Sequence, residues 1–179
     1  MPIEAYSGDT PMMQNQEALA VQAENLGFST LWFRDVPLRV PTFGDVGQIY
    51  DPLVYMGWIG AKTRKIALAT GALVLPLRHP LHTAKAAASI DLLTGGRFLF
   101  GAASGDRLEE FPAFGVDMET RGAAFRENLE WIHTAWDQDF PHLKSDQYGV
   151  LFGASDTIPK PENGKIPTLI VGGSQQDVN

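Results

Sequence analysis

The chain has 179 residues, of which 44% are hydrophobic and 20% are charged, and its formal net charge is −7 at pH 7. This acidic balance argues against a general nucleic-acid or anionic-membrane surface, and the absence of cysteine excludes disulfides, thiolate catalysis and cysteine-based metal sites. No apolar run approaches the roughly 18 residues of a membrane span, and no signal segment opens the chain, so we expect a cytoplasmic protein with one domain over residues 1–179.

Apolar residues at helical spacing and short apolar runs predict helices that alternate with strands. Asp51 followed by Pro52 fits a helix start, and Gly27 and the pair Gly95–Gly96 fit helix ends. In chain order the prediction is a strand at 3–6, a helix at 14–26, a strand at 30–34, a loop at 35–50, a helix at 51–62, a strand at 65–75, a helix at 79–94, a strand at 97–101, a loop at 104–120, a helix at 121–137, an irregular stretch at 139–165 with a small hairpin near residue 149, and a strand at 166–171.

This alternation of short buried strands with helices predicts an α/β fold with a parallel sheet of about five strands. A closed (β/α)8 TIM barrel takes about 250 residues. The sequence is therefore consistent with a small open α/β sheet or with the first part of such a barrel.

Small residues interrupt one of the predicted strands and follow two others, toward the carboxyl edge where α/β folds bind their ligands. Glycine inside a strand indicates a bulge or the close approach of a ligand. Glycine after a strand lets backbone N–H groups approach an anion, and serine adds a hydroxyl, although ordinary turns also use these residues. The residues in question are Thr70, Gly71 and Ala72, then Ser104 and Gly105, and finally Gly172, Gly173 and Ser174.

Titratable side chains also lie after the predicted strands. Asp35 follows the strand at 30–34 and is either a general base or a turn or cap residue. Arg78 and His79 follow the strand at 65–75 and could contact a substrate or cofactor. His82 could share a helix face with His79, but no motif supplies further ligands, so we expect no metal site. Phe111 lies in an aromatic loop that either covers a substrate mouth or is pinned to the surface.

An ordered set of segments resembles the bacterial luciferase-like flavin monooxygenase family. The resemblance covers nearly the whole chain and implies a (β/α)8 barrel of which this is an N-terminal portion with about five strands. The segments are Ala23 to Trp32, Thr63 to Pro76, Arg78 to Pro80, Leu93 to Gly105, and Ile166 to Ser174.

The resemblance implies a flavin-dependent oxidoreductase, first of all an FMN-dependent monooxygenase that uses O2, a small organic substrate and a separate flavin reductase. The alternatives are hydride transfer by the deazaflavin F420 and a non-catalytic flavin-binding or inert fragment, and a weaker alternative is a barrel hydrolase or lyase with a phosphate substrate. The resemblance also implies a bulge and a non-prolyl cis peptide at Thr70–Ala72 behind the flavin ring, and a flavin phosphate near Ser104 and Gly105.

Two departures from the family pattern concern the site. Luciferase has an arginine where this chain has Ser104, so the charge that neutralises the phosphate must come from elsewhere. No histidine follows Arg34, where some family members place a catalytic one, so Asp35 and His79 are the candidates for proton transfer. We also expect a homodimer, because an open sheet edge and a bare face at Leu169 and Val171 would recruit a second copy.

Overall fold

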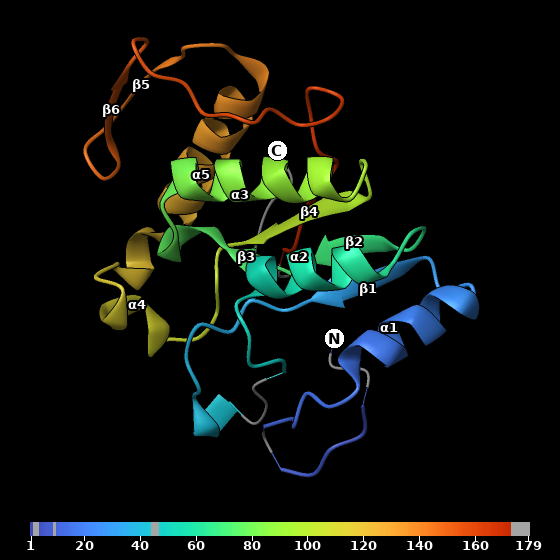
Figure 1. The fold of residues 1–179 in the computed structure, drawn as a ribbon. Coiled ribbons are helices and arrows are strands. Elements are labelled where there is room, and N and C mark those ends of the chain that lie inside the picture. Colours follow the sequence, from blue (N-terminus) through green and yellow to red (C-terminus); the bar gives the residue numbers. More distant parts are fainter. Residues whose placement is uncertain (2–3, 9, 44–46, 173–179) are drawn as a thin grey trace.

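A five-stranded parallel sheet forms the centre of the computed structural model, which describes residues 1, 4–8, 10–43 and 47–172. Strand β1 pairs with β2, and β4 pairs with β2, β3 and β7, in each case in parallel. The expected parallel α/β sheet is thus confirmed (Figure 1). The five strands are β1 (Thr30–Phe33), β2 (Ala67–Thr70), β3 (Leu73–Val74), β4 (Phe98–Ala103) and β7 (Thr168–Ile170).

The sheet reaches five strands in a different way from the prediction. The predicted strand at 65–75 is divided into β2 and β3, while described residues 4–6 form no strand, so the prediction at 3–6 is wrong there. The two carboxylate oxygens of Glu4 accept hydrogen bonds from Met13 N at 2.6 Å and Gln16 Nε2 at 2.9 Å. This segment therefore supports the start of the first helix and does not extend the sheet.

The helices begin and end close to the predicted positions. Asp51 caps α2, because its Oδ1 accepts hydrogen bonds from Leu53 N at 2.9 Å and Val54 N at 3.1 Å. The predicted hairpin near Gly149 is also present, as an antiparallel pair. The remaining elements are α1 (Gln16–Asn25), η1 (Pro41–Phe43), α2 (Pro52–Lys62), η2 (Leu75–Leu77), α3 (Pro80–Leu93), α4 (Glu110–Ala113), η3 (Met118–Thr120), α5 (Arg121–Asp137), β5 (His142–Ser145) and β6 (Gly149–Phe152).

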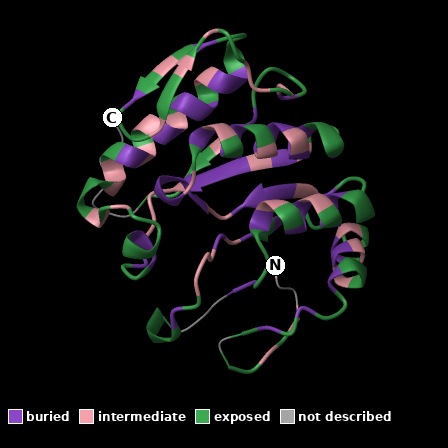
Figure 2. Cartoon of the chain, turned by 60° about the vertical axis from the view of Figure 1, so that its left-hand side comes forward, coloured by how far each residue is buried: buried purple, intermediate pink, exposed green. Residues whose placement is uncertain are grey.

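The core lies between the sheet and the helices that pack on it, and Figure 2 shows buried residues concentrated in the strands and on the inner helix faces. Phe33, Leu68 and Phe100 from three neighbouring strands are fully buried. The Trp136 indole of α5 donates to the carbonyl of Ala84 in α3 at 3.0 Å, which joins the two helices through a buried hydrogen bond. This packing leaves the carboxyl edge of the strands available for a site.

The amino edge of the sheet is held together by polar contacts instead. The guanidinium of Arg97, at the start of β4, donates to four backbone carbonyls and one hydroxyl. Its partners are the carbonyls of Gly60, Thr63, Ile66 and Thr94 and the Thr63 hydroxyl. One side chain thus ties the ends of α2 and α3 to the start of β2, and this edge is structural.

Candidate functional site

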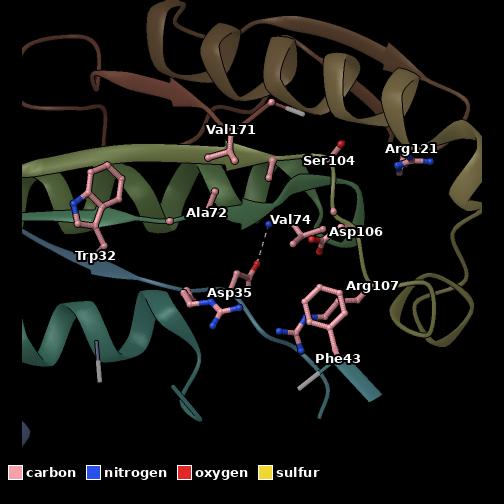
Figure 3. A pocket seen from close by; sticks show the side chains of 15 residues that line it. Trp32, Asp35, Phe43, Ala72, Val74, Ser104, Asp106, Arg107, Arg121 and Val171 are labelled. Carbon is pink, nitrogen blue, oxygen red and sulfur yellow. Dashed lines mark hydrogen bonds between the residues drawn. The ribbon is translucent and has the colours of Figure 1, made fainter. Parts of the chain in front are cut away.

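A cavity of about 680 Å³ lies at the carboxyl ends of β1, β3, β4 and β7 (Figure 3). Trp32 from β1 lies at one end of it, while Arg107 and Arg121 lie at the other end. Val74 and Ala72 line the part between these ends. The cavity is therefore at the edge of the sheet where the sequence predicted a ligand.

A β-bulge forms the wall of the cavity between β2 and β3. Ala69 pairs with Leu99, and Leu73 pairs with Ala102, so four steps along one strand oppose three along its neighbour. The extra residue falls at Gly71–Ala72, whose peptide bond is cis. Both features expected from the resemblance at this position are confirmed.

Thr70 holds the bulge from behind and does not itself line the described cavity. Its buried hydroxyl donates to the Gly101 carbonyl at 2.7 Å and accepts from the Gly101 amide at 2.8 Å, which satisfies both backbone groups of that residue. A Cβ at position 101 would lie 1.9 Å from the Thr70 carbonyl oxygen, so only glycine fits there. Thr70 therefore has a structural role in shaping the wall of the cavity. The sequence predicted it as a cofactor-binding residue and did not indicate this structural role.

Besides Gly71 and Ala72, three more of the predicted small residues line the cavity, namely Ser104, Gly105 and Gly172. Gly173 and Ser174 lie outside the described residues. Gly105 has a φ of +86°, and a Cβ there would approach Val74 Cγ1 to 2.7 Å. Packing alone thus requires glycine at this position, in addition to any contact with a ligand.

Two arginines that the sequence did not single out complete the rim. Arg121 is the first residue of α5, and its Nη1 donates to the Met118 carbonyl at 3.0 Å. It lines the same cavity as Ser104 (Figure 3). The Arg107 guanidinium stacks over the Phe43 ring, with 4.3 Å between its central carbon and the ring centroid. Both guanidinium groups line the same cavity as Ser104. They are therefore candidates for the positive charge that an arginine carries in luciferase at the position of Ser104.

Asp35 and Arg78 form a bidentate ion pair next to the cavity. Arg78 Nη2 donates to Asp35 Oδ1 at 2.7 Å, and Arg78 Nε donates to Oδ2 at 2.9 Å. The Val74 amide also donates to Oδ2 at 3.0 Å, while Arg78 Nη2 reaches Asp51 Oδ2 at 3.1 Å. Burial lowers the pKa of Arg78, but the hydrogen bonds and charges of Asp35 and Asp51 outweigh it and raise that pKa above its ordinary value.

His79 is not brought to the cavity. It precedes α3, where its Nδ1 accepts a hydrogen bond from Leu81 N at 3.3 Å, and its Nε2 lies 3.3 Å from the Tyr148 carbonyl oxygen. The His79 and His82 rings meet edge to face at 5.8 Å. This histidine caps a helix and contacts the hairpin, so the structure gives no support to a role at the candidate site.

Phe111, predicted as a substrate contact, is also outside the cavity lining. Its side chain is 1% exposed and packs with Val74 and Leu77 in a small core of its own. A Cβ at Gly105 would lie 3.0 Å from Phe111 Cζ. The sequence left two possibilities for this loop, a cover over a substrate mouth or a loop pinned to the surface. The structure shows a loop pinned by the buried Phe111 ring.

Glu110, which precedes Phe111, is a buried carboxyl that the sequence gave no reason to select. Its Oε1 accepts a hydrogen bond from the Leu38 amide at 3.4 Å. Burial raises the pKa of Glu110; the Leu38 amide and Arg107 oppose this, whereas the charges of Asp35 and Asp106 add to it. The result is a pKa above the ordinary value for glutamate, close to the arginine-lined rim.

Residues 1, 4–8, 10–43 and 47–172 contain no group of three or more histidine, aspartate or glutamate side chains placed to hold a metal ion. Within the same ranges, no helix combines the length and apolar character that crossing a bilayer requires.

Comparisons with known proteins give consistent matches. Residues 3–179 match the luciferase-like monooxygenase family. An uncharacterized protein of Mycobacterium tuberculosis strain H37Rv is 34% identical over 168 residues, which cover 86% of this chain and 58% of that protein.

Two solved structures share the fold. An F420-dependent secondary alcohol dehydrogenase, in complex with an F420–acetone adduct, superposes with a TM-score of 0.77 at 23% identity, over 92% of this chain and 49% of its own. The oxygenating constituent of 3,6-diketocamphane monooxygenase from Pseudomonas putida, in complex with FMN, gives a TM-score of 0.70 at 19% identity, over 86% of this chain and 44% of its own.

The chain spans less than two thirds of the length of each of these proteins. Its α/β sheet has the arrangement of their TIM barrels, of which the described part forms five parallel strands. With the family match over residues 3–179, the resemblance carried by the sequence motifs is confirmed, and the chain belongs to the luciferase-like monooxygenase family.

Proposed function

We propose that the cavity binds a flavin-type cofactor, FMN or the deazaflavin F420, and that the protein is an oxidoreductase acting on a small organic molecule. The observation that carries the proposal is one cavity with an apolar, glycine-lined end and a cationic end, at the carboxyl edge of the sheet. A flavin-type cofactor has the same division, since a flat ring system is joined to an anionic tail. Members of the family with solved structures bind cofactors of both types.

The apolar end has the residues that would orient a flat ring. Gly71 and Ala72 present little more than backbone at the bulge, and a Cβ at Gly71 would approach Trp32 Cε3 to 3.1 Å. Any larger side chain there would therefore reduce the space beside the indole. Trp32 and Val74 would exclude water from the ring.

The cationic end has the residues that would hold the anionic tail. Ser104 offers a hydroxyl, Gly105 and Gly172 allow close approach of the backbone, and Arg121 offers a guanidinium at the start of a helix. Charge-assisted hydrogen bonds of this kind are the strong ones in phosphate recognition. Arg121 is thus our candidate for the charge that an arginine supplies in luciferase at the position of Ser104.

When bound in its reduced form, such a cofactor supplies hydride, and a reduced flavin also reacts with O2. In the FMN case a separate reductase would supply the reduced cofactor, whereas F420 would transfer hydride without O2. The residues of this chain would bind, orient and shield the cofactor in either case.

The first test is a titration of the purified chain with FMN and with F420, followed by visible absorption and fluorescence. We expect one of them to bind, and Arg121→Gln to weaken that binding about tenfold or more, because a hydrogen bond to a charged group contributes about 1.5–3 kcal/mol. Arg126→Gln is the matched control, since Arg126 lies on the same helix and is exposed to solvent.

Equal affinity in wild type and Arg121→Gln would remove Arg121 from the proposed site. Binding of neither cofactor by the wild-type chain would contradict the proposed function itself. Consumption of O2 by the reduced complex would then separate the FMN monooxygenase from the F420 alternative.

A further inference from the structure

The buried ion pair of Asp35 and Arg78 joins the ends of two strands, β1 and β3, at the cavity. The Asp35 side chain is 1% exposed, Arg78 is 22% exposed, and the two lie 43 residues apart in the sequence. Asp35 follows β1, Arg78 follows η2, and the amide that also binds Asp35 belongs to Val74 at the end of β3. The contact is therefore long-range and links separate elements.

The geometry leaves Asp35 poorly suited to move a proton. Its two oxygens accept three hydrogen bonds, two from Arg78 and one from the Val74 amide, all between 2.7 and 3.0 Å. The guanidinium faces both oxygens at once, which is the arrangement that holds a carboxylate most firmly. A general base needs a lone pair directed at its substrate, and here protein donors take three of the roughly four lone-pair positions of the carboxylate.

The same contacts make Asp35 a support for the cavity wall. Val74 lies two residues beyond the cis bond of the bulge and itself lines the cavity. Its side chain also occupies the space next to Gly105, at the end of β4. By fixing the Val74 amide, Asp35 fixes the position of the bulge relative to the strand end where Ser104 lies.

The ion pair also borders a second cavity, of about 320 Å³. Asp35 lines both cavities, while Arg78 and Asp51 line only the second among the described residues. The ion pair is thus part of the wall between the candidate cofactor cavity, which would exclude water, and the second cavity. Breaking it would weaken that wall as well as the support of Val74.

We propose that Asp35 is a positioning residue for the cofactor cavity, acting through Val74 and Arg78, and that it takes no part in proton transfer. This inference rests on the proposed function and deepens it, because it assigns Asp35 to holding the site where the family pattern suggests a catalytic group. Arg78 is the partner that holds the Asp35 carboxylate in place through two hydrogen bonds.

The test compares Asp35→Asn with Asp51→Asn in the full chain. Asp35→Asn loses the charge that orients Arg78, and we expect it to weaken cofactor binding at least about tenfold and to shift the visible band and midpoint potential of the bound cofactor. Asp51→Asn removes the exposed partner of the same arginine but keeps a good helix cap, so affinity is expected to stay within about twofold. Arg78→Gln should reproduce the loss, and the double variant should add little to it.

Hydrogen exchange of the Val74 amide provides a readout without cofactor. We expect it to be protected in wild type and in Asp51→Asn and to lose protection in Asp35→Asn, while the Leu68 amide in the sheet stays protected. Wild-type affinity, spectrum and potential in Asp35→Asn would overturn the inference. If the wild-type chain bound neither FMN nor F420, the proposed function would fail, and unchanged exchange at Val74 in Asp35→Asn would then overturn the positioning role as well.

Discussion

Two polar contacts near the cavity join residues that are far apart in the chain. Asp35 meets Arg78 across 43 residues, and Thr70 meets Gly101 across 31. The sequence indicates which polar residues follow strands, and Asp35 and Thr70 were found in that way. It does not indicate their partners, because partners are set by strand register and by the path of the loops.

The two rim arginines were missed for the same reason. Arg121 begins a helix that the sequence does predict, but an arginine at a helix start is common on protein surfaces. Only the folded structure brings it to the cavity that Ser104 also lines. Placing Arg121 at the site requires the folded arrangement of the elements, because its position in the sequence alone does not bring it to a strand end.

Glu110 allows a prediction at this scale. Its raised pKa means that burial disfavours the ionised form, so the stabilisation from the neutral form is present at low pH and is lost as the pH rises through the folded-state pKa. Glu110→Gln keeps an oxygen for the Leu38 amide and removes the buried charge. We expect it to be at least as stable as wild type at neutral pH, with a flatter pH dependence.

Thermal unfolding from about pH 4 to about pH 8 would check this, with Glu109→Gln as the exposed neighbouring control. A Glu110→Gln variant that melts well below wild type at neutral pH would show that the charge on Glu110 stabilises the fold.

Single elements were predictable to different degrees. Helices α2 and α3 begin at side-chain caps, α5 has an apolar face, and all three lie where the sequence placed them. The strand predicted at 65–75 was located correctly, but its division at the bulge came from the resemblance, since one glycine in a strand has several explanations. The short helix α4 inside the loop predicted at 104–120 is held by buried Glu110 and Phe111, which no periodicity could show.

Glu24 at the end of α1 gives a prediction for the joining of elements. Its carboxylate accepts hydrogen bonds from the successive amides of Arg64, Lys65 and Ile66, at 2.9, 2.6 and 2.8 Å to Oε2, just before β2 begins. Burial raises the pKa of Glu24, but these donors and the charge of Arg97 outweigh it, so the pKa lies below its ordinary value. The stabilisation is therefore present above the unfolded pKa of about 4.3 and is lost as the pH falls through the lowered one.

Glu24→Gln is expected to lower the free energy of unfolding by about 1 kcal/mol at neutral pH, since part of the contact is open to solvent. The difference from wild type should disappear in acid. Glu17→Gln on the same helix removes only a surface ion pair with Lys62 and should have little effect. Equal denaturant midpoints for the two variants would mean that Glu24 is dispensable for the joint between α1 and β2.

At the scale of the molecule, the two edges of the sheet differ in role: the amino edge is structural and the carboxyl edge forms the candidate site. The amino edge is closed by Arg97 and Glu24, whose partners are backbone groups. The carboxyl edge carries the cavity. The sequence predicted the ligand edge, because small residues gather toward the carboxyl ends of the strands, but it did not indicate the polar contacts of the amino edge.

The sheet also predicts how the chain associates. In the described part of the chain β1 and β7 each pair on one side only, and Trp32, Leu169, Ile170 and Val171 are between 43% and 60% exposed. Unpaired strand edges and contiguous apolar surface favour association with another chain. We therefore expect a homodimer or larger assembly at micromolar concentration, measured by light scattering after size exclusion, and a uniform 19.6 kDa species would contradict this.

The bulge between β2 and β3 has one more consequence, which concerns the two faces of the strand. Side chains alternate between faces, so an even-numbered residue such as Leu68 points to the core before the bulge. The additional residue inverts this parity, and afterwards Leu73 belongs to the main core while Val74 lines the cavity. Deleting Ala72 would restore simple alternation along the strand. Each side chain beyond that point would then face the opposite side of the sheet, so Leu73 would face the cavity and Val74 the main core. A single inserted residue in this strand thus decides which side chain faces the cavity.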